Sequence, residues 1–341
     1  MTISGFEKGV NLGGWISQYG EFSRQRFENF IKEKDVARIA SWGFDHVRLP
    51  VDAPVLLKDE KDFVLRKEGF EYIDRCLKWC RKNNLNLVLD LHKAPGYSFS
   101  SLKDNTLFSS EKMQSNFISL WQELTERYQN EKDNLIFELL NEVVDEKEGW
   151  NKLAHETIKA IRKLDETRKI IYGGPNYNAV TSLKDIALIE DDPHIIYTFH
   201  YYLPFMFTHQ KASWTDLTSS MDFDVNYPGP NPELVNFLNK NNDDPSDQKE
   251  AAVFNKEFLK EKFEPARKFK KENDCQLYCG EYGVIGCAPR ESRENWYRDF
   301  TDIINELEIS RAVWSYKEMN FGLVDQEGNV VNQKIVDIIS Q

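Results

Sequence analysis

Cysteine is scarce in this chain, with 5 among 341 residues. So few cysteines cannot form a disulfide framework, and an odd number leaves at least one thiol unpaired. Cys76 and Cys80 lie four residues apart in a helical pattern, and Cys275 and Cys279 flank or lie in an expected strand. Two such pairs could in principle bind zinc, but structural zinc sites favour tighter spacings within loops. The pattern favours buried reduced thiols and a reducing compartment.

Long apolar runs and basic charge are also lacking. No stretch of 18 or more apolar residues occurs, so we expect no membrane-spanning helix. The start of the chain lacks the features of a secretory signal peptide, which predicts a cytoplasmic protein, or a secreted one if a signal has been removed. The net charge of −12 argues against nucleic acid and other polyanions as partners. A neutral polymer would not be repelled, and we expect a monomer.

Strand-like and helix-like segments alternate along the chain. Short runs rich in Val, Ile, Leu and Tyr predict eight buried strands, at 7–13, 44–50, 85–92, 135–142, 169–174, 194–202, 276–283 and 311–317. Amphipathic patterns predict helices at 24–41, 68–83, 111–130, 150–166, 252–272, 292–307 and 333–339. Eight strands, each followed by a helix, predict an α/β fold of the (β/α)8 TIM-barrel type, as a single catalytic domain over 1–341.

An open, doubly wound sheet is the alternative fold. Such sheets normally carry a Gly-rich phosphate loop, and NLGGW at 11–15 does not match the GxGxxG pattern. The barrel is therefore the better interpretation.

One connection, from 202 to 250, is much longer than the others. A structureless loop of that length is improbable in a compact domain, so this segment should be functional or carry its own small structure. After Tyr202 it contains six more aromatic residues before a polar stretch: Phe205, Phe207, Trp214, Phe223, Tyr227 and Phe237. We expect an inserted lid subdomain at 202–250 after the sixth strand. The alternative is an insertion with its own small core.

Two glutamates end apolar runs that lie far apart in the chain. Glu142 closes LIFELLNE, and Glu281 lies in QLYCGEYG. In a barrel of parallel strands, the carboxyl ends of the strands face a common mouth. Glycosidic cleavage needs two carboxylates there: one protonates the leaving oxygen, and the other attacks the anomeric carbon or activates water. A single strand-end glutamate could equally cap a helix or pair with arginine.

Arg48 ends the second expected strand, and an arginine at a barrel mouth should pair with a carboxylate. Glu281 is the useful candidate, because the guanidinium would keep it ionised. Asp90 and Glu138 are the alternatives. By strand alternation Glu138 lies on the same side as Glu142, so it must be buried with a partner, or a bulge must break the alternation.

Further polar side chains are expected at the same mouth. Asn141 can hydrogen-bond a sugar hydroxyl without changing the local charge. His92 closes the third expected strand, and His200 and Tyr202 close the sixth, where their spacing of two places both side chains on one side. We expect these groups to donate hydrogen bonds to sugar hydroxyls or to a nucleophilic carboxylate.

Trp314 ends the eighth expected strand, where its indole could stack on a pyranose ring or belong to the core. Leu277 and Cys279 share the alternation of Glu281 and are expected to fill the barrel interior beneath it. The remaining histidines are interpreted as lone surface or structural residues: His46, His155, His194 and His209.

Seven segments, in this order, resemble glycoside hydrolase family 5: GVNLGGW, GFDHVRLP, VLDLHKAPG, FELLNE, TFHYY, YCGEYGV and AVWSY. The resemblance covers essentially the whole chain. It implies a retaining β-glycanase with Glu142 as acid/base and Glu281 as nucleophile. It also implies substrate-binding or supporting roles for Arg48, His92, Asn141, His200, Tyr202 and Trp314. Lys93 departs from the pattern, because many members have a second histidine there.

We therefore expect a retaining endo-β-1,4-glucanase that acts on soluble or mixed-linkage β-glucan without metal or cofactor. The connections after the first four strands read as short or purely helical, so no loop should close an end of the cleft. A β-mannanase, or an enzyme with both activities, would use the same chemistry. Two other classes stay open: a metal-dependent barrel enzyme with ligands His92, Glu142, His200 and Glu281, and a non-catalytic carbohydrate-binding protein.

Overall fold

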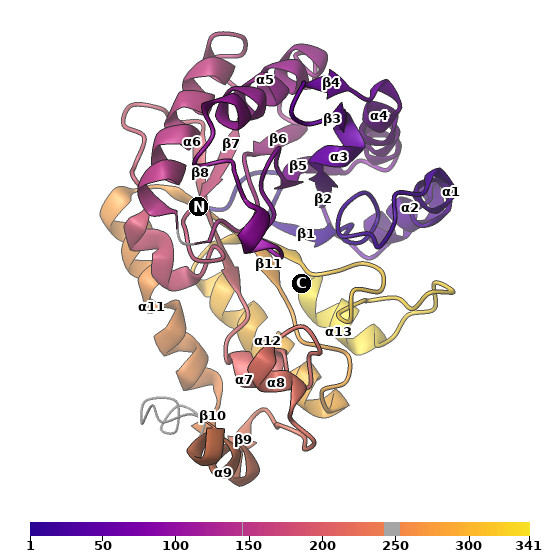
Figure 1. Cartoon of the computed structure of the whole chain (residues 1–341). Helices are drawn as coiled ribbons and strands as arrows, with labels where there is room; N and C mark the ends of the chain where they lie inside the picture. The colour runs from indigo at the N-terminus through magenta and orange to yellow at the C-terminus, as the bar shows by residue number, and fades with distance from the viewer. Residues whose placement is uncertain (145, 242–252) are drawn as a thin grey trace.

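The computed structural model describes residues 1–144, 146–241 and 253–341. At its centre eight parallel strands close into a barrel in the order β1-β12-β11-β8-β7-β6-β5-β2, with β1 paired to both β12 and β2. They span β1 (Lys8–Asn11), β2 (His46–Asp52), β5 (Asn86–Lys93), β6 (Leu135–Glu138), β7 (Ile170–Gly173), β8 (Ile195–Tyr201), β11 (Gln276–Tyr282) and β12 (Ser310–Val313) (Figure 1). The predicted barrel is confirmed, and an open sheet is excluded.

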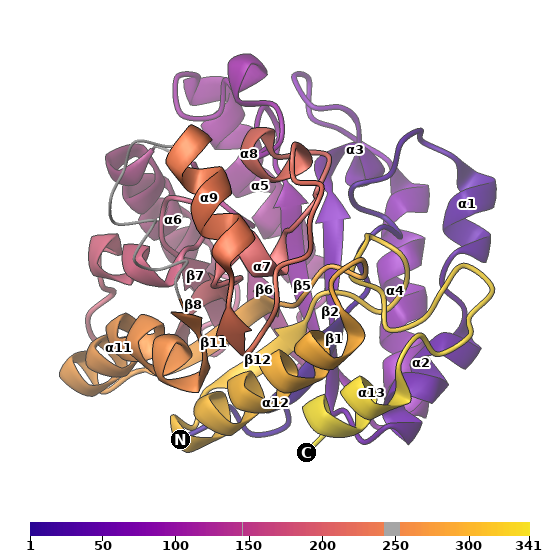
Figure 2. The ribbon, with the colours of Figure 1, turned by 90° about the horizontal axis from the view of Figure 1, so that it is seen from below.

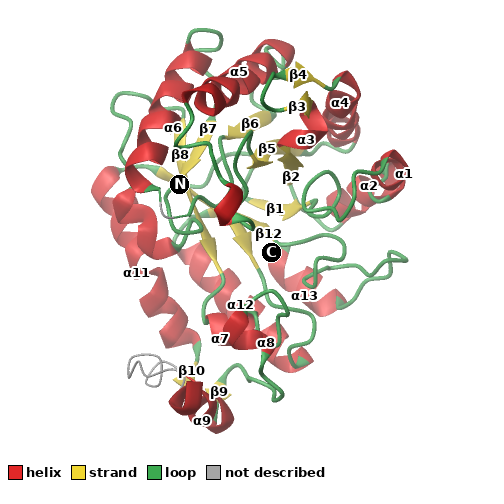
Figure 3. Ribbon diagram, in the orientation of Figure 1, coloured by secondary structure: helices red, strands yellow, loops and turns green. Residues whose placement is uncertain are grey.

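Helices surround this barrel on the outside (Figure 3). They are α1 (Arg24–Asn29), α2 (Glu33–Ser41), α3 (Ala53–Leu56), α4 (Lys67–Lys82), α5 (Glu111–Arg127), α6 (Lys147–Arg162), α11 (Lys256–Asn273), α12 (Arg290–Glu306) and α13 (Gln333–Ile339). The segment predicted as one helix at 24–41 forms two. A second helix begins because the Asp35 carboxylate accepts from the Lys32 N–H, 2.9 Å away. None of the described helices combines the length and apolarity needed to cross a bilayer.

The prediction that a helix follows every strand is wrong for the connection between β7 and β8. Between β7 and β8 the regular element is a short 3-10 helix, η2 (Val180–Asp185). Asn176, Tyr177 and Asn178 all have positive φ, at 58°, 58° and 51°. Three successive left-handed residues cannot belong to a right-handed α-helix, so the chain turns sharply there.

Two connections after the first barrel strands are more elaborate than expected. Between α3 and α4 lies a hairpin of β3 (Leu57–Asp59) and β4 (Val64–Leu65), and the loop at 94–110 after β5 contains a 3-10 helix, η1 (Leu102–Asp104). The expectation of short or purely helical connections is therefore wrong. Strands of two or three residues are too short for an alternation to be visible in the sequence.

The core has two layers, and a bulge decides which side chains fill the inner one. The hydrophobic part of the barrel interior is a cluster of buried residues: Ile3, Phe6, Val88, Ile136, Ile171, Ile196, Tyr278 and Ala312. Leu277 and Cys279 lie instead in the larger layer between strands and helices, so their predicted place is wrong. Cys279 pairs with Phe199 but Glu281 pairs with His200, which leaves Gly280 as an extra residue. The bulge reverses the alternation, and Tyr278 and Glu281 both point inward.

The described part of the long insertion contains α7 (Phe205–Thr208), α8 (Asp216–Ser219), β9 (Gly229–Pro230) and α9 (Pro232–Asn241). Its β9 pairs with β10 (Val253–Phe254), which follows the insertion. The insertion lies beside α12 and the mouth side of the barrel (Figure 2). Phe207 and Tyr227 belong to the outer core of the barrel, and the Tyr227 hydroxyl donates to Asp299 of α12 at 2.8 Å. The described residues thus share the main core. The remainder of the expected lid, 242–250, lies outside the described residues.

Candidate active site

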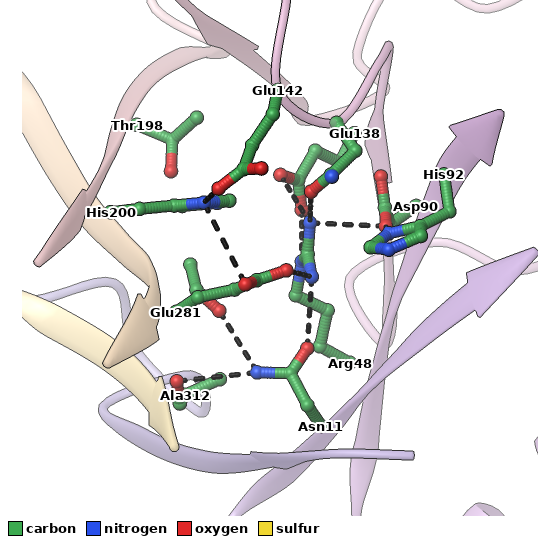
Figure 4. A network of polar contacts seen from close by, with 12 residues as sticks. Asn11, Arg48, Asp90, His92, Glu138, Glu142, Thr198, His200, Glu281 and Ala312 are labelled. Atoms are coloured by element: carbon green, nitrogen blue, oxygen red, sulfur yellow. Dashed lines mark hydrogen bonds and ion pairs between the residues drawn. The ribbon is translucent and has the colours of Figure 1, made fainter. Parts of the chain in front are cut away.

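Arg48 is the centre of a buried polar network at the carboxyl ends of the strands (Figure 4). Its guanidinium contacts Glu138 at 2.6 and 2.9 Å, Asp90 at 3.0 Å and Glu281 at 2.9 Å. All three carboxylates considered from the sequence are therefore partners at once, each from a different strand. Burial by itself would lower the pKa of Arg48, but the three carboxylates raise this pKa well above its ordinary value. The guanidinium stays charged.

Two asparagines complete the coordination of this guanidinium. The side-chain oxygens of Asn11 and Asn141 accept from Arg48 at 2.9 and 3.0 Å. The Asn11 amide in turn donates to the carbonyl of Gly280 at 2.9 Å, so it ties Arg48 to the bulge before Glu281. Asn11 was missed in the sequence. The available signal was a polar residue at the end of an apolar strand, which is fully buried here.

Glu142 and Glu281 face each other across His200. The Nδ1 atom of His200 lies 2.8 Å from Glu142 Oε1 and 3.8 Å from Glu281 Oε2. The Tyr202 hydroxyl donates to Glu281 Oε2 at 2.9 Å. A carboxylate oxygen of Glu142 lies within 4.8 Å of a carboxylate oxygen of Glu281. His200 and Tyr202 act from one side, as their spacing predicts, and Glu281 accepts hydrogen bonds from Tyr202 and Arg48.

The two carboxyl groups have different electrostatic surroundings. Burial raises the pKa of Glu142 to about 8, and Arg48 offsets only part of this effect. Burial also raises the pKa of Glu281, but the positive charge of Arg48 acts to lower it. Burial lowers the pKa of His200, which favours a neutral imidazole. At neutral pH the proton of this pair therefore belongs on Glu142, and the negative charge belongs on Glu281 beside Arg48.

His92 and Trp314 form a second part of the mouth. Their rings stack with centroids 5.7 Å apart and planes inclined by 4°. His92 Nδ1 lies 2.7 Å from Asp90 Oδ2, which connects this pair to Arg48. Burial lowers the pKa of His92 to about 3, so the ring is neutral. A Cβ at Gly13 would lie 2.7 Å from the indole, which explains a glycine in NLGGW.

Glu142 does not lie on a strand. The predicted strand 135–142 ends at Glu138, which is buried and bound to Arg48. The first sequence alternative is therefore confirmed, because Glu138 is buried with a partner. The pairing of β6 with β5 and β7 has no bulge, and the chain simply leaves the strand after Glu138. The Asn141 N–H donates to the carbonyl of Leu91 at 3.0 Å and so holds the departing chain against β5.

Lys93, the departure from the family pattern, forms an ion pair with buried Asp52 at 3.2 Å. A strand irregularity creates this pair, because Val51 is opposite Leu91 and Asp52 is opposite Lys93. The lysine therefore compensates a carboxylate that is 2% exposed.

His209 was interpreted as a lone surface or structural histidine, but it lies in an aromatic group beside the site. Its ring stacks on Phe205 at 4.4 Å and contacts Tyr202 at 5.0 Å, Phe321 at 5.3 Å and Trp214 at 6.1 Å. Burial lowers the pKa of His209 to about 4. The spacing of four between Phe205 and His209 was the available signal.

A metal site was one alternative for these residues. Ligand atoms of Glu142, His200 and Glu281 lie within 4.8 Å of one another, so their spacing would suit a cation. His92, the fourth expected ligand, instead contacts Asp90 and Trp314. The five cysteines are free thiols, and Cys76 and Cys80 are both buried on α4.

A family model identifies the class of enzyme. The model for cellulase (glycosyl hydrolase family 5) matches residues 6–320. The chain belongs to glycoside hydrolase family 5. It is therefore a glycoside hydrolase, as the seven segments indicated.

Individual relatives agree with this family. The chain is 46% identical over 339 residues to endoglucanase C of Acetivibrio thermocellus, covering 98% of both chains. It is 37% identical over 310 residues to cellodextrinase A of Ruminococcus flavefaciens, covering 90% of this chain and 84% of the relative. The structure of Thermotoga maritima Cel5A in complex with cellobiose superposes with a TM-score of 0.80 at 24% identity, covering 99% and 98% of the two chains. At that identity the superposition supports the fold.

Proposed function

We propose that this family 5 hydrolase is a retaining endo-β-1,4-glucanase, with Glu142 as general acid/base and Glu281 as nucleophile. The carboxylate separation carries the proposal, because oxygens of the two groups lie within 4.8 Å of each other. Retaining glycosidases hold their carboxyl groups about 5–5.5 Å apart, whereas inverting enzymes need about 6.5–9.5 Å to admit a water. A direct attack on the anomeric carbon fits this spacing.

In the first step Glu142 donates its proton to the glycosidic oxygen. Burial keeps that proton in place near neutral pH, since it raises the pKa of Glu142 to about 8. We assign the Nδ1–H of neutral His200 as a donor to Oε1, which leaves Oε2 to carry the acid proton. Glu281, oriented by Arg48 and Tyr202, attacks the anomeric carbon as the bond to the leaving oxygen breaks. The product is a glycosyl ester of Glu281.

In the second step the roles reverse. Glu142, now a carboxylate, removes a proton from water, and the water oxygen attacks the anomeric carbon of the ester. Glu281 leaves as a carboxylate that Arg48 stabilises. Two inversions give net retention of the β configuration.

Two buried nitrogens are available to hold the sugar. Asn141 Nδ2 and His92 Nε2 have no hydrogen-bond partner among the described residues. Leaving a buried polar group unpaired costs about 1–3 kcal/mol, and sugar hydroxyls would remove that cost. These two atoms, with the indole of Trp314, are the proposed contacts to the ring that reacts.

The names of the relatives support a β-1,4-glucan substrate. Endoglucanase C and cellodextrinase A cover most of this chain at 46% and 37% identity. A β-mannanase activity stays as the alternative, because a Thermotoga maritima Cel5A structure with TM-score 0.80 contains mannotriose. The net charge of −12 favours neutral polymers over anionic ones such as pectin.

The mode of attack is tested by comparing viscosity with reducing sugar on carboxymethylcellulose, barley β-glucan, lichenan and glucomannan. We expect viscosity to fall well before much reducing sugar appears, on the glucans more than on glucomannan, with or without a chelator. Early release of glucose or cellobiose at constant viscosity would show a closed cleft. Loss of activity with chelator would favour the metal enzyme, and no reducing sugar at all would favour a binding protein.

The insertion is proposed to cover one rim of the cleft and to supply an aromatic subsite through Trp214. This indole is 51% exposed and contacts Phe321 and His209, which adjoin Tyr202. Trp214→Ala should raise KM on polymer about fivefold to tenfold, the range of a lost stacking contact, with little change in melting temperature.

Leu164→Ala is the matched control for Trp214→Ala, because Leu164 is 41% exposed and lies just after α6, at the opposite end of the barrel. It should leave KM unchanged. A large drop in melting temperature for Trp214→Ala, at constant KM, would assign Trp214 to the core of the insertion.

A further inference from the structure

The loop that carries Glu142 is held by a side chain that has no assigned role. Because β6 ends at Glu138, the strand does not fix the position of Glu142. The Tyr97 hydroxyl donates to the backbone carbonyl of Glu142 at 2.9 Å and accepts from the backbone N–H of Val144 at 2.9 Å. One hydroxyl thus clamps the peptides on both sides of Val143, while the Val143 carbonyl accepts from the Tyr177 N–H at 2.9 Å.

A tight turn places Tyr97 against this loop. The Tyr97 N–H donates to the Ala94 carbonyl at 2.9 Å, with Pro95 and Gly96 at the two central positions. Gly96 has φ of +68°, as a type II turn requires, and a Cβ there would lie 2.6 Å from Thr106 Oγ1. The APG segment after the third predicted strand is therefore a turn that returns the chain to the mouth.

The tyrosine is rigid as well as close. The Gly96 N–H donates to Glu60 Oε2 at 3.0 Å, and the Gly96 carbonyl accepts from the backbone of Thr106 at 2.8 Å. Tyr97 is 4% exposed, and its ring contacts Phe108 with centroids 5.6 Å apart. Because the ring is held in place, its hydroxyl can hold the backbone of Glu142 in a fixed position.

We propose that Tyr97 is a positioning residue for Glu142, which holds the backbone so that the carboxyl group reaches the glycosidic oxygen. This inference rests on the acid/base role proposed for Glu142. The hydroxyl acts through the backbone, since it bonds to the Glu142 carbonyl and the Val144 N–H. General acid catalysis depends on hydrogen-bond reach, and a displacement of about 1 Å can cost about a hundredfold in rate.

Tyr97→Phe removes both hydrogen bonds and keeps the ring. The test compares kcat/KM on phenyl and 2,4-dinitrophenyl β-cellotriosides. Phenolate is a poor leaving group that needs protonation, whereas dinitrophenolate departs without it. We expect kcat/KM to fall about tenfold on the phenyl substrate and less than about twofold on the dinitrophenyl substrate. A merely structural loss would lower both rates alike.

Tyr128→Phe is the matched control. Tyr128 is also 4% exposed and loses one hydrogen bond, from its hydroxyl to Asp74 at 3.0 Å, at the end of α5 remote from the mouth. It should lower the melting temperature without changing the ratio of the two rates. If Tyr97→Phe does not fold, Tyr97→p-aminophenylalanine can be tested instead, because it supplies an N–H donor to the Glu142 carbonyl. This variant should have nearly the same ratio of kcat/KM on the two substrates as the unmodified chain.

Glu142→Ala distinguishes a failure of the acid/base assignment from a failure of the positioning role of Tyr97. It should show the same dependence on the leaving group as Tyr97→Phe, but much larger. If Glu142→Ala shows this dependence and Tyr97→Phe does not, the role of Tyr97 is overturned and the acid/base assignment stands. If Glu142→Ala loses activity equally on both substrates, the acid/base assignment fails, and the role of Tyr97 fails with it.

Discussion

Glu142→Ala should lower kcat/KM on β-glucan by about a thousandfold or more, because it removes the proton donor of the first step. It should lower kcat as well, because it also removes the base of the second step. With an aryl cellotrioside that has a good leaving group, added azide should restore turnover. Azide attacks the glycosyl ester without a base and fits the space left by the carboxyl group. The product should be the β-glycosyl azide, identified by NMR, which also tests net retention.

Glu281→Ala should be at least as inactive, because no glycosyl ester can form. Azide should give no β-glycosyl azide in this variant. The opposite pattern, with β-azide from Glu281→Ala alone, would reverse the two assignments. Glu131→Ala is the control: the Glu131 side chain is 14% exposed, against 15% for Glu142, but it lies before the amino end of β6 and should keep full activity.

The same assignment predicts a pH profile. Glu142 must be protonated to act as an acid, so kcat/KM should fall as pH rises through its pKa of about 8. Glu281 must be ionised, so the rate should fall again on the acid side. With a dinitrophenyl substrate, which needs no acid, the alkaline fall should be absent. An alkaline fall of equal size on both substrates would contradict the role of Glu142.

Arg48→Met should have the second largest effect, on stability as well as rate. It leaves Asp90, Glu138 and Glu281 buried without the charge that compensates them. Breaking a buried ion pair costs about 3–5 kcal/mol, and three carboxylates depend on this one guanidinium. We expect a free energy of unfolding lower by at least that amount, measured by denaturant titration, and kcat/KM lower by at least about a hundredfold.

The three buried carboxylates also determine how the stability of Arg48→Met changes with pH. Burial already raises the pKa of Asp90 to about 7, and Arg48 opposes that rise. Without Arg48 the carboxyl groups take up protons at still higher pH, so the folded variant is least stable at alkaline pH. The stability deficit should shrink as pH falls and the groups become neutral. A deficit that grows toward acid pH would contradict the three-carboxylate account.

Arg168→Met is the matched control for Arg48. Arg168 is also 2% exposed or less, with an ion pair to Asp165 at 3.0 Å and a hydrogen bond to the Leu135 carbonyl at 2.8 Å, at the amino end of β6. It should lose stability but keep kcat/KM. Arg48→Lys should recover part of the stability and little activity, since an ammonium cannot contact Glu138 and Glu281 in the same fork geometry.

The sequence by itself predicted the barrel and most of the side chains at its mouth. Eight short apolar runs separated by amphipathic helices predict a parallel sheet covered by helices on both faces, and the lack of a GxGxxG loop favours the barrel over an open sheet. Parallel strands bring all their carboxyl ends to one rim, so Arg48, His92 and His200 could be expected together without knowledge of their neighbours. These are properties of local pattern and of strand direction.

Only the tertiary structure decided how those side chains pair. Arg48 binds three carboxylates at once, which the strand register allows. Asp90 is opposite Pro50 and Glu138 is opposite Asp90, so both lie two residues further along the barrel than Arg48, within reach of its long side chain. The bulge at Gly280 depends on the pairing of β8 with β11, and it alone turns Glu281 inward. The clamp of Tyr97 on Glu142 joins two loops. Register, bulges and contacts between loops depend on partners distant in the chain, and local sequence does not encode them.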